Sequence, residues 1–228
     1  MTYQKIKTYY EKKKYKKCYK LENKLISLTS TEAEVYPKLI IQHGKTLFSL
    51  KRYHDAIKYF KISLSMLKDE FVIHQVNGYL FKTYYEISDY ENIIKYGLAT
   101  CEYQNIDILE KANILAIVGR FYYLQHLSSN KKVYLIRGLF YNTESQKLFN
   151  QTKQTNTENY FYTLYDCADI NFGLEDYDTA QKLYEKLEKM TNDNDLLLGI
   201  YTNLAYIYKE KGYFDTNLFY ERKIKLLN

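Results

Sequence analysis

An aromatic residue recurs along this chain about every 37 residues, each time just after a polar turn and at the start of a stretch with helical apolar periodicity. The recurring residues are Tyr15, Tyr53, Tyr90, Tyr177 and Phe214, with spacings of 38, 37, 87 and 37 residues. The long interval holds two units if one of them carries an insertion of 13 residues. A fixed period of this size indicates stacked repeats, because one unit cannot bury its own apolar face and must pack against the next.

The composition favours helices as the content of each repeat. One proline and eight glycines in 228 residues are too few for an all-β protein with its many turns. Hydrophobic residues make up 46% of the chain, which is enough to build a core and excludes disorder along the whole length. We therefore predict an all-α fold of about twelve helices joined by short loops.

The second repeat shows the pattern most fully. It begins at Pro37 and carries Gly44 at its eighth position, Tyr53 at its seventeenth, Ala56 at its twentieth and Phe60 at its twenty-fourth. Small residues at the eighth and twentieth positions allow two antiparallel helices to approach closely, and the large ones fill the space to the next pair. The stretch NLAYIYKEKGYFD at 203–215 repeats the same arrangement near the end of the chain.

This pattern resembles the tetratricopeptide repeat (TPR). The resemblance implies a right-handed α-solenoid of about six antiparallel helix pairs in one domain over residues 1–228. The expected units lie near 1–29, 37–69, 74–104, 110–150, 160–190 and 197–228.

Some positions depart from the repeat. Phe81 and Asn217 stand where small residues are expected, and the fourth unit loses its turn pattern at 128–130. We expect a longer or bent second helix within 132–150, with Gly138 marking an irregularity.

Two polar stretches are the predicted loops. Asn150 to Glu158 is the better candidate for a flexible loop, and Thr191 to Asp195 is a shorter one, with Asp195 capping the helix that follows.

No pattern of catalytic or metal-binding residues is present. The sequence lacks glycine-rich phosphate-binding motifs and HExxH, and His43, His54, His74 and His126 do not have metal-ligand spacing. We interpret His43 and His54 as structural histidines with satisfied hydrogen bonds, and Cys18 and Cys167 as buried, inert thiols. The prediction is a non-enzymatic protein with no cofactor and no metal.

The three cysteines are far apart, no run of 18 apolar residues exists, and no signal peptide is visible. These features predict a cytoplasmic protein without membrane segments.

The resemblance also places particular residues on a concave groove lined by the first helix of each pair. Basic residues at the ninth position and aromatic residues at the twelfth form two rows along units two to four, and acidic residues follow in unit five. Such a groove suits an extended peptide, because the bases can bind a carboxylate and the aromatic rings can hold apolar side chains. The predicted groove residues are Lys45, Phe48, Lys82, Tyr85, Asn113, Arg120, Tyr123, Tyr162, Asp166, Asp169, Asn203 and Tyr206.

The first 20 residues hold eight lysines and one acid, a net charge of +7 in a chain whose total is +6. Such a segment can contact the phosphates of a nucleic acid, or it can simply keep the outer face of an end helix solvated. The candidate phosphate contacts are Lys12, Lys13, Lys14, Lys16 and Lys17.

The function we predict from these features is a regulatory module that binds a peptide or protein in the groove. It resembles the peptide-sensing TPR domains of the Rap, PlcR, Rgg and PrgX group, although we expect no helix-turn-helix domain here. A nucleic-acid-associated protein is the alternative. Self-association through the solenoid ends, near Leu226 and Leu227 for example, is a further possibility.

Overall fold

A computed structural model describes residues 2–227, with Thr2 described in its backbone alone. Within this range the protein is all-α and contains twelve helices and no strand, as the sequence predicted. The helices divide between two compact units, Met1–Ile106 and Asp107–Asn228. We call them unit 1 and unit 2.

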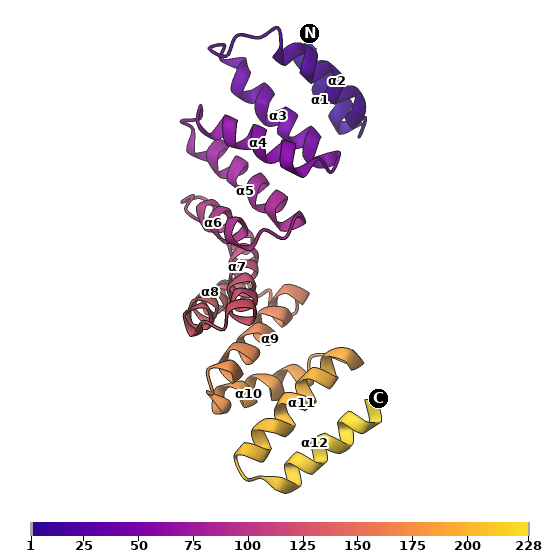
Figure 1. Cartoon of the computed structure of the whole chain (residues 1–228), viewed down its shortest axis with the longest axis vertical. Helices are drawn as coiled ribbons and strands as arrows, with labels where there is room; N and C mark the ends of the chain where they lie inside the picture. The colour runs from indigo at the N-terminus through magenta and orange to yellow at the C-terminus, as the bar shows by residue number, and fades with distance from the viewer. Residues whose placement is uncertain (1, 228) are drawn as a thin grey trace. The chain divides into compact units, whose positions relative to one another are not determined.

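Unit 1 holds three antiparallel helix pairs, drawn from indigo to magenta in Figure 1. Their helices are α1 (Thr2–Glu11), α2 (Tyr15–Ile26), α3 (Val35–Ser49), α4 (Tyr53–Leu64), α5 (Glu70–Glu86) and α6 (Tyr90–Cys101). The core of the unit is aliphatic and aromatic, and Leu39, Phe60, Leu80 and Ile93 are completely buried.

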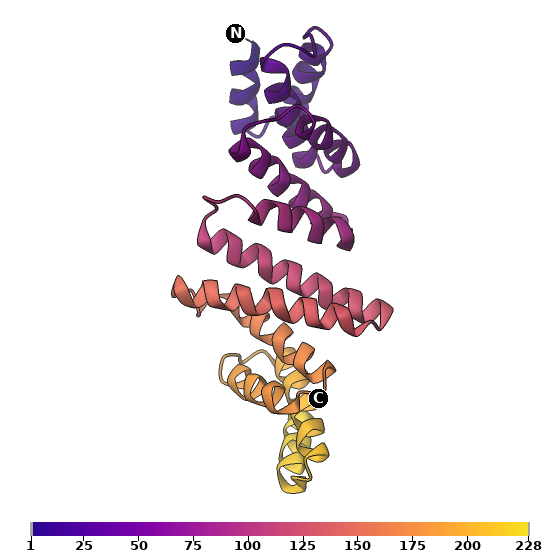
Figure 2. The same cartoon turned by 90° about the vertical axis from the view of Figure 1, so that its left-hand side faces the viewer.

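Unit 2 holds the other three pairs. Its helices are α7 (Ile108–Ser129), α8 (Lys132–Gln151), α9 (Glu158–Gly173), α10 (Tyr177–Glu188), α11 (Asn194–Glu210) and α12 (Phe214–Leu227). Figure 2 shows α7 and α8 running side by side as the longest pair, with 22 and 20 residues. One apolar cluster, centred on Leu164, Ala168 and Tyr184, joins α9 to its neighbours in this unit.

Small residues bring the paired helices close together, as the repeat pattern predicted. A Cβ atom on Gly44 would stand 2.6 Å from the ring of Phe60 on the partner helix. A Cβ atom on Gly119 would stand 2.1 Å from the side-chain oxygen of Asn142. Gly138 acts in the same way and does not mark an irregularity, because its added Cβ would lie 3.0 Å from the carbonyl oxygen of Gly119 while α8 continues unbroken.

Two of the expected departures have physical explanations. The fourth pair differs because both of its helices are long, and the left-handed conformation of Asn130, with φ of 51°, ends α7 after the two serines. At the twentieth place of the last unit, buried Asn217 donates a hydrogen bond of 2.9 Å to the carbonyl of Ala205. An amide thus replaces a small apolar residue without an unsatisfied polar group.

Two loop predictions need correction. Asn150 lies within α8 and Glu158 begins α9, so the connection is shorter than the polar stretch suggested. Asp195 is not the cap of α11. Asp193 occupies that position, and its carboxylate accepts hydrogen bonds from the backbone nitrogens of Asp195 and Leu196.

Candidate functional site

A cluster of basic and aromatic side chains lies on the first helices of unit 1. The ammonium groups of Lys45 on α3 and Lys82 on α5 stand 4.8 and 6.0 Å from the ring centre of Tyr79 on α5. Phe60 stacks on the same ring, with centroids 5.4 Å apart and planes 18° apart. The core therefore fixes the tyrosine, and the tyrosine in turn holds two cations by cation–π attraction.

The charge of this cluster is not neutralised within unit 1. Neither Lys45 nor Lys82 forms an ion pair with an acidic group in the described part of the chain. Burial lowers the pKa of Lys45, and the positive charge of Lys7 on α1 lowers it further. The three lysines and Tyr79 form what we call the lysine–tyrosine patch, whose unpaired positive charge suits an anionic group.

Aromatic residues extend this surface. Phe48 is half-buried and meets Tyr53 edge to face, with ring centroids 5.7 Å apart. Tyr85 is 49% exposed on α5. Tyr10 and Ser49 join α1 to α3 through a hydroxyl–hydroxyl hydrogen bond of 3.2 Å. The first helices of unit 1 thus combine unpaired cations with exposed ring surface.

In unit 2 the corresponding base is already paired. The Arg120 Nε on α7 donates to Asp166 Oδ2 on α9 at 3.0 Å, and its guanidinium lies 5.0 Å from the ring centre of Tyr162. Asp166 is only 7% exposed. Burial raises the pKa of Asp166 to about 6, against the lowering effect of Arg120. This arrangement ties two predicted ligand contacts to each other.

A separate hydrogen-bond chain runs through the other acidic residue, Asp169. The hydroxyl of Tyr184 donates to Asp169 Oδ1 at 2.6 Å, and that of Tyr123 lies 3.5 Å from Oδ2. Asn203 on α11 donates to the Tyr184 oxygen at 2.8 Å. Burial and Asp169 together raise the pKa of Tyr123, so its hydroxyl stays protonated and able to donate. The chain links α7, α9, α10 and α11 of this unit.

The remaining predicted residues of unit 2 lie apart from this chain. Asn113 accepts a hydrogen bond of 2.7 Å from Asn159. Tyr162 lines a cavity of about 410 Å³ near the start of α9 and α11. Tyr206 is 45% exposed and packs edge to face on Phe172 at 5.3 Å.

The twelve predicted groove residues thus divide between the units, four in unit 1 and eight in unit 2. Their contact with a ligand stays a prediction, and so does the row that was expected to run through Lys45, Lys82 and Arg120. Sequence reasoning missed Tyr79 and Lys7. Tyr79 precedes Lys82 by three residues on a helix, so the two share a face, and this spacing is the signal that could have identified Tyr79.

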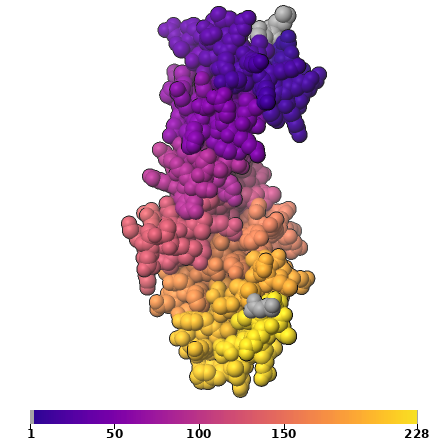
Figure 3. Space-filling view, turned by 45° about the vertical axis from the view of Figure 1, so that its right-hand side comes forward, coloured from indigo at the N-terminus to yellow at the C-terminus, as the bar shows by residue number. Residues whose placement is uncertain are grey.

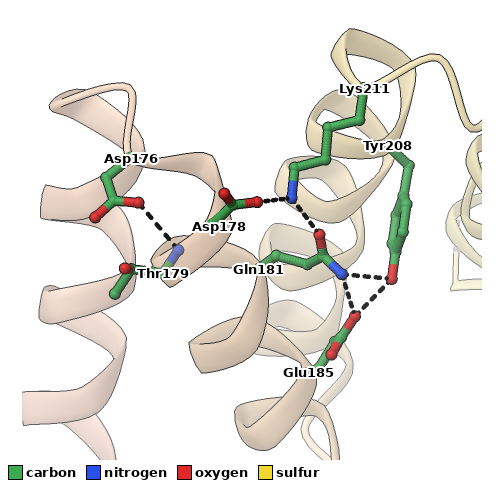
Figure 4. Close-up of polar contacts among 7 residues, drawn as sticks. All are labelled: Asp176, Asp178, Thr179, Gln181, Glu185, Tyr208 and Lys211. Atoms are coloured by element: carbon green, nitrogen blue, oxygen red, sulfur yellow. Dashed lines mark hydrogen bonds and ion pairs between the residues drawn. The ribbon is translucent and has the colours of Figure 1, made fainter.

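A second polar cluster in unit 2 is internally satisfied. Figure 4 shows Lys211 donating to both Asp178 and Gln181, while Tyr208 and Gln181 both donate to Glu185. Four of these side chains, Asp178, Gln181, Tyr208 and Lys211, border a cavity of about 710 Å³. Because these polar groups bond one another, the cluster stabilises the contact between α10 and the end of α11.

The N-terminal lysines are exposed around the turn between α1 and α2. Figure 3 shows the indigo side chains of this segment at the surface of unit 1. The candidate phosphate contacts form no ion pair with an acidic residue in the described part of the chain. They are Lys12, Lys13, Lys14, Lys16 and Lys17.

The cysteines and histidines mostly match their predicted structural roles. Cys18 and Cys167 are buried, and burial raises their pKa to about 11 and about 12. His43 is buried with its Nδ1 3.0 Å from Glu22 Oε2. His54 is different, because it is exposed on α4 and makes no hydrogen bond with another described residue.

No group of three or more possible metal ligands occurs among residues 2–227. None of the helices described is long and apolar enough to cross a membrane. On α12, Phe214, Leu218 and Phe219 are exposed large apolar residues, and self-association through this end stays a prediction.

Comparison with solved structures identifies the architecture. The C-terminal part of a TPR repeat-containing protein from Cytophaga hutchinsonii matches with a TM-score of 0.68 and 17% identity, over 100% of this chain and 84% of that one. The chain has the tetratricopeptide-repeat fold. MamA also matches this chain, with a TM-score of 0.63 and 15% identity, over 86% of this chain and 93% of MamA. The apo form of RapI matches with a TM-score of 0.59 and 13% identity, over 99% and 75%.

These likenesses confirm the predicted resemblance to TPR proteins, Rap-type structures among them, at the level of fold. No protein-family model and no curated protein matches the chain in sequence.

Proposed function

We propose that this TPR protein is a non-enzymatic, regulatory binding module of the cytoplasm, and that the first helices of unit 1 hold an acidic peptide or a peptide C-terminus. The observation that carries the proposal is the lysine–tyrosine patch, where Lys45 and Lys82 flank Tyr79 without an acidic partner. Cations held by an aromatic ring and left unpaired can bind a carboxylate without first breaking an ion pair.

Exposed ring surface beside the cations supports a peptide as the ligand. Phe48 and Tyr85 lie three residues after Lys45 and Lys82 on the same helices. Residues three apart share a helix face, so each cation has an aromatic neighbour. Aromatic side chains supply large contact area at low entropic cost, which suits apolar side chains of an extended segment.

Unit 2 supports a different role for its predicted contacts. Arg120 and Asp166 neutralise each other, so a ligand carboxylate must displace Asp166 before it reaches the guanidinium. We therefore assign the primary carboxylate site to unit 1, and propose Tyr162, Asn203 and Tyr206 as secondary contacts for the same class of ligand.

A peptide array tests the proposal. Peptides of nine residues with randomised acidic, basic and neutral positions, each made with a free and an amidated C-terminus, are probed with the wild type. We expect the bound peptides to be enriched in acidic residues or free C-termini. The Lys45→Glu/Lys82→Glu variant should lose these peptides, and equal binding by both proteins contradicts the proposal.

The matched control is Lys12→Glu/Lys13→Glu, which makes the same charge change at exposed residues in the α1–α2 turn. It should keep the acidic peptides. It also tests the alternative function, nucleic-acid association through the N-terminal lysines. That alternative predicts oligonucleotide binding that weakens steeply with salt and is lost in this control variant.

A further inference from the structure

A small cavity in unit 1 lies apart from the lysines of the patch. It has a volume of about 280 Å³ and is formed by the first turns of α5, the last turn of α6 and the segment after it. The volume suits one side-chain-sized group rather than a larger ligand. The residues that line it are Glu70, Ile73, His74, Asn77, Ala99, Glu102, Tyr103 and Gln104.

Aromatic rings form one wall of this cavity. His74 and Tyr103 stack with centroids 4.8 Å apart, and Phe71 lies 5.9 Å from Tyr103 and 6.4 Å from His74. Phe71 contacts these two rings from outside the cavity lining, and His74 and Tyr103, which line it, are both partly exposed. The negative faces of such rings attract a cation.

The orientation of His74 is fixed by the backbone. Its Nδ1 lies 3.0 Å from the carbonyl oxygen of Thr100, near the end of α6. Because a carbonyl can only accept, Nδ1 carries the hydrogen of this bond, and Nε2 of the neutral ring is left as an acceptor. The ring therefore offers a hydrogen-bond acceptor as well as an aromatic face.

Two acidic side chains at the cavity are unpaired. The carboxylates of Glu70 and Glu102 make no hydrogen bond or ion pair with any residue in the described range, and no lysine or arginine lines the cavity. The C-terminal end of α6 adds partial negative charge. Asn77 is only 8% exposed, lines the cavity, and makes no hydrogen bond within the part of the chain that is described. Its amide therefore has donor and acceptor capacity that a ligand in the cavity can use.

We propose that this cavity binds a guanidinium group, as in an arginine side chain of a peptide or protein partner. A guanidinium is planar and stacks on aromatic rings, and it carries five hydrogen-bond donors for the Glu70 and Glu102 carboxylates and His74 Nε2. A lysine ammonium carries the same charge but is not planar, so it cannot stack on the rings in the same way. An anion is repelled by both carboxylates. This cavity would bind a cation, whereas the lysine–tyrosine patch would bind an anion, so the two proposals are independent.

The test uses the full chain labelled with ¹⁵N and a minimal probe, Nα-acetyl-arginine N-methylamide. Titration should shift the amide signals of residues 70–77 and 102–104 along saturable curves. The citrulline analogue has the same shape without the charge, and should bind about tenfold more weakly. The lysine analogue should fall between the two.

Two variants connect this binding to the cavity. Glu70→Gln/Glu102→Gln removes both carboxylate charges, and Tyr103→Leu removes one ring. Each change should lower the affinity for the arginine probe by about tenfold. Glu91→Gln is the control, because it removes an exposed carboxylate elsewhere on α6. A circular dichroism melt establishes that each variant is folded. Equal affinity for the citrulline probe, or unchanged binding by the two-carboxylate variant, overturns the proposal.

Discussion

At the scale of single residues, the fold depends on side chains whose burial was not apparent from their type. Glu22 lies close to a lysine-rich segment whose composition predicts exposure to solvent, yet its side chain is completely buried. Its two oxygens accept from Thr46 at 2.8 Å and meet His43 at 3.0 Å, both on the next helix pair. Local sequence does not reveal a partner more than 20 residues away, so this buried pair could not be predicted.

The role of the small residues at repeat positions, by contrast, was predictable from the sequence, and substitutions can test it. Gly44→Ala should destabilise the protein by about 1–3 kcal/mol, because the new methyl group overlaps the buried ring of Phe60. Gly78→Ala is a matched control on a helix of the same unit, where an added Cβ meets Thr100 at an ordinary 3.8 Å.

The control should be neutral or stabilising by up to about 1 kcal/mol, since alanine favours a helix over glycine. Urea denaturation followed by circular dichroism measures both effects. Equal stability of the two variants would mean that Gly44 does not set the distance between α3 and α4.

The buried carboxyl of Asp166 gives a pH dependence with a definite sign. Its pKa rises from 3.8 to about 6 in the folded protein, so the native state takes up a proton between pH 6 and 4 that the unfolded state does not yet bind. Acidification through this window therefore favours the native state, by at most about 3 kcal/mol.

Asp166→Asn removes this contribution. The unfolding free energy of the wild type minus that of the variant should increase as the pH falls from 6 to 4, measured by urea denaturation at each pH. For Asp178→Asn the difference should stay flat or decrease on acidification, because the hydrogen bond and charge of Lys211 lower the pKa of Asp178. A flat difference for Asp166→Asn contradicts the assignment.

At the scale of helices, capping residues set where each element begins. Five helices start after an aspartate whose carboxylate accepts a backbone hydrogen bond, at Asp69, Asp89, Asp107, Asp176 and Asp193. The choice among the acidic residues of 193–195 is made by backbone conformation, because Asp193 is extended with ψ of 120° while Asp195 is already within α11. The prediction from sequence placed the start of α11 two residues too late, because the sequence does not show which of the two aspartates has the extended backbone.

Alanine substitutions distinguish the two positions. Asp193→Ala should cost about 1 kcal/mol, because two backbone N–H groups of α11 lose their acceptor. Asp195→Ala should cost only a few tenths of a kcal/mol through its charge near the helix start. Thermal and urea unfolding measure both, and a larger cost at Asp195 would return the capping role to that residue.

At the scale of the whole chain, periodicity was the strongest guide. The spacing of aromatic residues predicted twelve helices in six pairs, because the repeat fixes element length and turn position together. It also placed Lys45 and Lys82 on the first helices of their pairs, where the structure holds both against Tyr79. It did not predict that Arg120 would be paired, because Asp166 comes from the following helix pair and only the packing of α7 beside α9 brings the two together.

The most direct test of the proposed function is a charge-swap experiment on the lysine–tyrosine patch. Fluorescence anisotropy measures the affinity of an acidic peptide, selected on the array, for the wild type and for Lys45→Glu/Lys82→Glu. The variant should bind it at least about tenfold more weakly, and should regain affinity for the same peptide with its acidic residues changed to lysine. If the variant binds the acidic peptide as tightly as the wild type does, the carboxylate site does not lie on the first helices of unit 1.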